Sequence, residues 1–142
     1  MGTVYETITI KNQFDVRCVS YGYKKEDEIR QATVESVVDT GAITLFIPDE
    51  LRLQLGLEIL DERPAAVANG QVEMVKRTEA VEIHWKDRSM VCSPRVIPGG
   101  TEILLGVIPM EDMDLIVDPA REQLVGAHGD EIVHRMPSVR WR

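Results

Sequence analysis

Strict alternation of polar and apolar residues runs through several segments of the chain and restricts it to a mainly β fold. Residues 5–10 alternate in this way and are rich in β-branched side chains. Residues 81–85 place Val, Ile and Trp on one side, and residues 89–92 return after a turn at 86–88. Because successive side chains of a strand point to opposite faces, these segments predict strands with one buried face. The length of 142 residues suits a single domain, which we expect to span residues 1–142.

Further strands and their connections follow from composition. We expect strands at residues 16–21 and 32–38, joined through a solvated hairpin loop at the charged residues 24–28. The dipeptide Asn69-Gly70 predicts a tight hairpin, because both residue types tolerate a positive φ.

Two short helices are also expected. The first begins near Pro48, since proline is tolerated in a first turn and acidic residues follow it. Gly56 offers a stop for this helix. The second starts after Pro109 and ends at Pro119.

The charge balance and apolar content exclude several classes of partner. The net charge is −8, whereas nucleic-acid binding requires a basic face. No apolar run is long enough to cross a bilayer, and the first residues do not resemble a signal peptide. We therefore expect a cytoplasmic protein that binds neither nucleic acid nor membrane. In that compartment Cys18 and Cys92 are expected to be reduced thiols.

An apolar strand that ends in Asp39-Thr40-Gly41 is the strongest functional signal. On its own this tripeptide is also ordinary turn chemistry. However, Val38 precedes it and Ala42 follows it, and apolar flanks are unusual for a surface turn. A carboxylate at a strand end can be approached by a second carboxylate, and glycine allows a sharp backbone turn beside it.

A second motif, Ile103-Leu104-Leu105-Gly106, is another apolar strand that ends in glycine before a predicted helix. The two motifs in this order, with a hairpin between them, resemble the retroviral and retroviral-like aspartic proteases, in particular their prokaryotic single-domain branch. The resemblance implies a retropepsin-like acid protease barrel with two short helices. It also implies that Asp39 is catalytic and that its loop is supported by neighbouring residues. Those supporting residues are Thr40, Gly41, Ala42, Leu105 and Gly106.

The same resemblance implies a flap, a substrate and a dimer. The flap that covers the substrate best matches Ala68-Asn69-Gly70. The chain has a single Asp-Thr-Gly, so a second aspartate must come from another copy, and a symmetric homodimer is implied. Two nearby carboxylates share one proton, so that one activates water and the other polarises a peptide carbonyl. The expected activity is hydrolysis of a peptide or protein, without a metal or another cofactor.

Other interpretations remain open at this point. The chain could be a catalytically silent retropepsin-like module that captures peptides or mediates assembly. It could also be a small β-barrel in which Asp-Thr-Gly is only a turn. The three histidines, His84, His128 and His134, are scattered without a repeated ligand spacing, which argues against a metal site or a Cys/His nucleophile pair.

Overall fold

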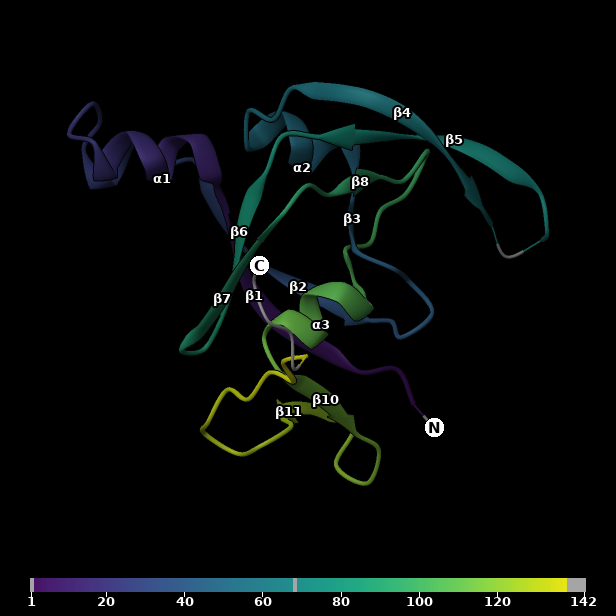
Figure 1. Cartoon of the computed structure of the whole chain (residues 1–142). Helices are drawn as coiled ribbons and strands as arrows, with labels where there is room; N and C mark the ends of the chain where they lie inside the picture. The colour runs from purple at the N-terminus through teal and green to yellow at the C-terminus, as the bar shows by residue number, and fades with distance from the viewer. Residues whose placement is uncertain (1, 68, 138–142) are drawn as a thin grey trace.

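A large curled sheet dominates the computed structural model, which describes residues 2–67 and 69–137 (Figure 1). Within these residues nine strands form one sheet in the order β4-β5-β8-β3-β9-β2-β1-β6-β7, and β10 and β11 form a separate two-stranded sheet. The strands are β1 (Tyr5–Asn12), β2 (Gln31–Val38), β3 (Leu45–Ile47), β4 (Ile59–Ala66), β5 (Val72–Thr78), β6 (Val81–Trp85), β7 (Arg88–Cys92), β8 (Arg95–Val96), β9 (Leu104–Leu105), β10 (Leu115–Asp118) and β11 (Gln123–Gly126). The mainly β fold predicted from the alternation is therefore confirmed.

The core lies on the apolar faces of the alternating strands. Ile10 of β1 pairs with Ile83 of β6, and both side chains are fully buried. Leu45, Ile47 and Leu105 join the same buried cluster from the central strands. Burying one such side chain stabilises the fold by about 1.5–3 kcal/mol, so the period-two pattern fixes which face of each strand turns inward.

The described residues contain three α-helices rather than the two that were expected: α1 (Gln13–Ser20), α2 (Asp49–Gln54) and α3 (Val107–Asp112). The prediction for α2 is confirmed, since Leu51 and Leu55 are buried on one face and Gly56 follows the helix with φ +66°.

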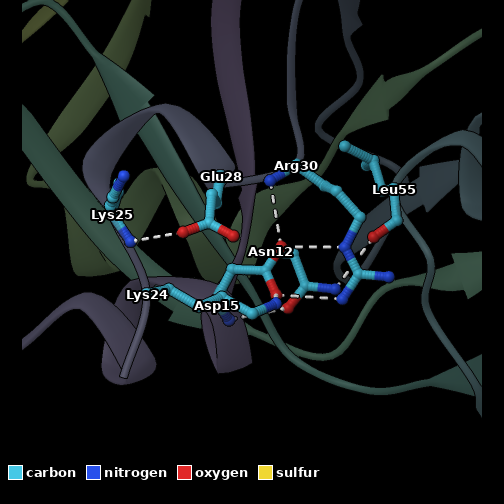
Figure 2. A network of polar contacts seen from close by, with 7 residues as sticks. All are labelled: Asn12, Asp15, Lys24, Lys25, Glu28, Arg30 and Leu55. Atoms are coloured by element: carbon cyan, nitrogen blue, oxygen red, sulfur yellow. Dashed lines mark hydrogen bonds and ion pairs between the residues drawn. The ribbon is translucent and has the colours of Figure 1, made fainter. Parts of the chain in front are cut away.

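The predicted strand at residues 16–21 is wrong, because residues 16–20 lie in α1 and Tyr21 caps its end. Asn12 caps the helix by accepting a hydrogen bond from the Asp15 backbone N–H at 3.1 Å. The Asp15 carboxylate is fully buried and accepts bonds from Lys24 Nζ at 2.6 Å and from Arg30 Nε at 2.8 Å (Figure 2). These tertiary contacts override the β propensity of the segment. The charged residues 24–28 form an exposed connection with a 3₁₀ turn, η1 (Glu26–Glu28), and not a hairpin loop.

The second helix was predicted too far along the chain. Pro109 lies inside the first turn of α3, and the residues expected to continue the helix form β10 instead. The helix ends because Asp114 adopts φ +55°. The buried Arg88 donates to the Met113 and Asp114 carbonyls at 2.8 Å each, and so takes up acceptors that the helix end leaves unpaired.

None of the helices formed by the described residues is long and apolar enough to cross a membrane.

Candidate active site

Asp39 follows directly on β2 and continues its hydrogen-bond ladder. The Asp39 backbone N–H donates to the Leu105 carbonyl at 3.0 Å. The chain then turns sharply: the Ala42 N–H donates to the Asp39 carbonyl at 3.1 Å, and the Gly41 N–H donates to Asp39 Oδ1 at 2.8 Å. Gly41 thus supplies a backbone donor to the carboxylate.

The strand β9 lies between the two strands that the Asp39 loop connects. It runs parallel to β2, with Val38 opposite Leu105, and antiparallel to β3, with Leu45 opposite Leu105. Leu105 is therefore held on both sides and is fully buried. The second sequence motif contacts the first through backbone bonds, which fixes the position of the Asp39 loop.

Gly106 allows α3 to approach the backbone of this loop. A Cβ added at Gly106 would collide with the Thr44 carbonyl oxygen and would lie 2.6 Å from the Ala42 oxygen. Beyond the glycine, the Val107 N–H donates to the Ala42 carbonyl at 2.8 Å and the Ile108 N–H donates to the Ile43 carbonyl at 3.0 Å. The roles of Thr44 and Ile43 were missed from the sequence, because only the fold shows which backbone faces Gly106.

In the single chain the loop is open. The side chain of Asp39 is half-buried, while Thr40 and Gly41 are exposed. Ile43, a large apolar residue four positions after Asp39, is 62% exposed. Two surface cavities, of about 670 and 380 Å³, lie elsewhere and do not include Asp39. One chain therefore presents the carboxylate without enclosing it.

The predicted hairpin between the motifs is present. Strands β4 and β5 pair antiparallel along their length, and the turn is closed by bonds between Val67 and Gln71 and from the Gly70 N–H to the Val67 carbonyl, each 2.9 Å. Gly70 has φ +82°, which is the conformation that favours glycine. Asn69 accepts a bond from the Gln71 N–H at 3.0 Å, and Ala68 lies outside the described residues. Figure 1 shows the hairpin tip reaching toward the same side of the molecule as the loop after β2.

A row of cross-strand neighbours extends the face on which Asp39 lies. Because side chains alternate along a strand, Asp39 and Val37 share one face of β2, and Val38 faces the core cluster. Val37 lies beside Leu104 of β9, and Leu104 lies beside Phe46 of β3. All three are half-buried. This apolar row is a surface along which an extended peptide could lie.

The other nucleophile and ligand candidates do not assemble into a site. His84 contacts Glu82 at 2.9 Å, and His128 contacts Asp114 at 2.7 Å. Burial raises the pKa of the Cys92 thiol to about 11, which keeps it protonated at neutral pH and unsuited to nucleophilic attack. In the part of the chain that the structure describes, three or more His, Cys, Asp or Glu side chains do not cluster as metal ligands would.

Comparisons with known proteins agree with this geometry. A family model described as "gag-polyprotein putative aspartyl protease" matches residues 26–111, which include both motifs and more than half of the chain. The structure is similar to the retroviral protease-like domain of Ddi1 from Leishmania major, with a TM-score of 0.55 and 15% identity over 93% of this chain and 91% of that one. A search of curated protein sequences found no match. The strand-loop-strand arrangement around Asp39 and the family match lead to one conclusion: the chain belongs to the retroviral-type aspartyl protease family of gag polyproteins.

Proposed function

We propose that the protein is an aspartic endopeptidase whose active site forms between two copies of the chain, each of which contributes Asp39. The observation that carries the proposal is the position of Asp39 in a loop fixed by β9 and Gly106, with the Gly41 N–H directed at its carboxylate. Ala42 and Leu105 take part in the backbone bonds that hold this loop, whereas Thr40 is exposed and its supporting role stays a prediction. Membership of an aspartyl protease family supports the same chemistry.

Peptide hydrolysis at such a site needs one proton shared by the two carboxylates. The ionised carboxylate accepts a proton from a water molecule, whose oxygen attacks the peptide carbonyl carbon. The protonated carboxyl donates to the carbonyl oxygen, which becomes a hydroxyl of a tetrahedral intermediate. Transfer of a proton to the amide nitrogen then breaks the C–N bond and releases an amine and an acid. Water is the only co-reactant, so no cofactor or metal is required.

Exposed apolar residues around Asp39 support the two-chain arrangement. Ile43 and Ile108 are joined by a backbone bond beside the Asp39 loop, and Ile108 is 46% exposed. Tyr5 pairs with Val37 on the neighbouring strand and is 52% exposed. Contiguous exposed apolar side chains mark surfaces that another protein covers. A second copy placed across this surface would bring its own Asp39 toward the first.

A subunit-mixing experiment tests the proposal. Wild-type chains are unfolded and refolded with increasing amounts of Asp39→Asn chains, so that subunits pair at random. If each active site needs two carboxylates, specific activity on an unstructured protein substrate falls as the square of the wild-type fraction. Asp87→Asn is the matched control, because Asp87 is an exposed acid in the β6–β7 turn and the change in charge is the same. Mixing with this variant should leave activity unchanged.

The alternative functions predict different curves. A linear fall in activity would show that each chain works alone. This result would reject the shared active site even if Asp39 proved essential. A silent peptide-binding module would show no activity at any ratio. Light scattering across the series reports the dimer content, which separates loss of chemistry from loss of association.

A further inference from the structure

Three arginines continue the cross-strand row beyond its apolar part. Phe46 of β3 lies beside Arg95 of β8, Arg95 lies beside Arg77 of β5, and Arg77 lies beside Asp61 of β4. Arg63 follows Asp61 by two residues and so lies on the same face of β4. The face that carries Val37 and Asp39 at one end thus carries a charged cluster at the other.

The cluster holds more positive charge than it can neutralise. Asp61 accepts two bonds from Arg77, at 3.0 and 2.7 Å, and lies 3.7 Å from Arg63. Three guanidinium groups therefore surround one carboxylate, which gives the cluster a net charge of +2 in a chain whose total is −8. An excess of one sign at a single place attracts a ligand of the opposite sign.

Arg95 is the member of the cluster whose charge is not matched. Its Nη1 donates to the Ser93 carbonyl at 2.7 Å, and among the described residues it forms no ion pair with a carboxylate. The side chain is half-buried. Burial and the neighbouring Arg63 and Arg77 together lower the pKa of Arg95. A carboxylate brought in by a ligand would reverse this unfavourable environment.

We propose that Arg95, assisted by Arg63 and Arg77, forms a subsite that selects peptide substrates with an aspartate or glutamate a few residues away from the cleaved bond. The proposal rests on the proposed function, because it assumes that the peptide lies along the face of Asp39. The subsite follows the apolar stretch formed by Val37, Leu104 and Phe46. This order predicts substrates with apolar residues at the cleaved bond and an acidic residue farther along the peptide.

Strand spacing gives the position of the acid. Arg95 lies three strands away from Val37, which is roughly 14 Å at about 4.8 Å per strand. An extended peptide advances about 3.4 Å per residue, and the arginine side chain shortens the gap by several ångströms. The selected acid is therefore expected roughly two to four residues from the cleaved bond.

Cleavage of a peptide library measures this preference. The wild-type protein should enrich Asp and Glu at one position among the cleaved peptides. Arg95→Met should lower the ratio of kcat/KM for an acidic over a matched neutral peptide by at least about tenfold, the loss of one charge-assisted hydrogen bond. Arg95→Glu should turn the preference toward Lys or Arg. Arg121→Met is the control, because Arg121 is exposed in the β10–β11 turn, outside the charged cluster, and the substitution removes the same charge. It should leave the ratio unchanged.

Binding to the Asp39→Asn protein separates the subsite from the chemistry. Fluorescence anisotropy of labelled peptides should show that the Asp39→Asn protein binds acidic peptides more tightly than neutral ones. The Asp39→Asn, Arg95→Met double variant should lose this preference. Cleavage without an acidic preference would overturn the subsite and leave the protease intact. Preferential binding of acidic peptides without any cleavage by the wild type would keep the subsite and overturn the proposed function. Neither binding nor cleavage would overturn both.

Discussion

Replacing Gly106 by alanine tests whether the second motif holds the Asp39 loop. Gly106 has φ −94° and ψ −172°, which any residue adopts, so the substitution strains no dihedral angle. The three atoms nearest to the added methyl group all belong to the backbone, including the Thr44 nitrogen at 2.7 Å. Because backbone atoms cannot rotate away as a side chain can, either α3 or the loop must move.

The magnitude follows from the contacts that this movement breaks. Restoring van der Waals distance lengthens the two hydrogen bonds from α3 to the Ala42 and Ile43 carbonyls, which are now 2.8 and 3.0 Å long. Each bond contributes about 1 kcal/mol and overpacking costs about 1–3 kcal/mol. Alanine also lowers the conformational entropy of the unfolded chain, which offsets about 0.4–1 kcal/mol of this destabilisation. We expect a net loss of about 2–4 kcal/mol in the free energy of unfolding, with loss of proteolytic activity.

Urea denaturation followed by circular dichroism measures the first effect and peptide cleavage the second. Gly99→Ala is the matched control. Gly99 has φ +65° and open space around its Cα, so alanine there strains the dihedral angle without a collision and costs about 1 kcal/mol. If Gly106→Ala were no more destabilising than Gly99→Ala and remained active, the close approach of α3 would not be what positions the loop.

Three further outcomes are expected. Asp15→Asn should lower the free energy of unfolding at pH 7 by about 1.5–3 kcal/mol, because it weakens the charge-assisted hydrogen bonds between a buried carboxylate and its two partly exposed cationic partners. Arg30 holds the pKa of Asp15 far below its ordinary value of 3.8, so this stabilisation is complete well above that pH and is lost progressively as the pH falls below it. In urea titrations the difference between the two proteins should therefore stay constant from pH 7 to about pH 5 and should narrow from about pH 4 to pH 2. Proteolytic rate should follow a bell-shaped pH profile with an optimum on the acidic side of neutral, and a rate that rises steadily into alkaline pH would point to a different nucleophile. Gly70→Val should raise KM clearly while changing the melting temperature little. Backbone amides near residues 69–72 should exchange their hydrogens more slowly when an inhibitor binds. If the exchange of these amides does not change, the flap assignment is wrong.

The sequence was sufficient where its signals are local. Alternation located β1, β6 and β7, and the proline and acidic start located α2, because each of these depends on near neighbours in the chain. The apolar strand before Asp39 and the one before Gly106 were both identified as strands. Their parallel pairing, with Val38 beside Leu105, could not be deduced from residue pattern alone, because strands so far apart in sequence are brought together only by the fold.

The failures occurred where distant residues decide the local conformation. Residues 16–21 contain valines that favour a strand, yet the buried bonds of Asp15 to Lys24 and Arg30 hold them in α1. The signal that could have found this helix is Asn12 three residues before Asp15, which is a capping pattern. The end of α3 depends on Arg88, which lies on β7, and no residue near Pro109 indicates this contact. The charged row from Asp61 to Arg95 likewise required the strand register.

The contrast between Asp39 and the other acids explains why function is assigned to Asp39. Asp15 accepts bonds from two cationic side chains, and Asp114 accepts bonds from His128 and from the Val133 N–H at 2.9 Å, so both carboxylates stabilise the fold. The Asp39 carboxylate, within the described residues, accepts its hydrogen bond from Gly41, two residues away in the same loop. The loop itself is held by backbone bonds to β9 and α3 that any side chain at this position would permit. The fold thus constrains the position of Asp39 and leaves its carboxylate available, which is the arrangement that a reacting group requires.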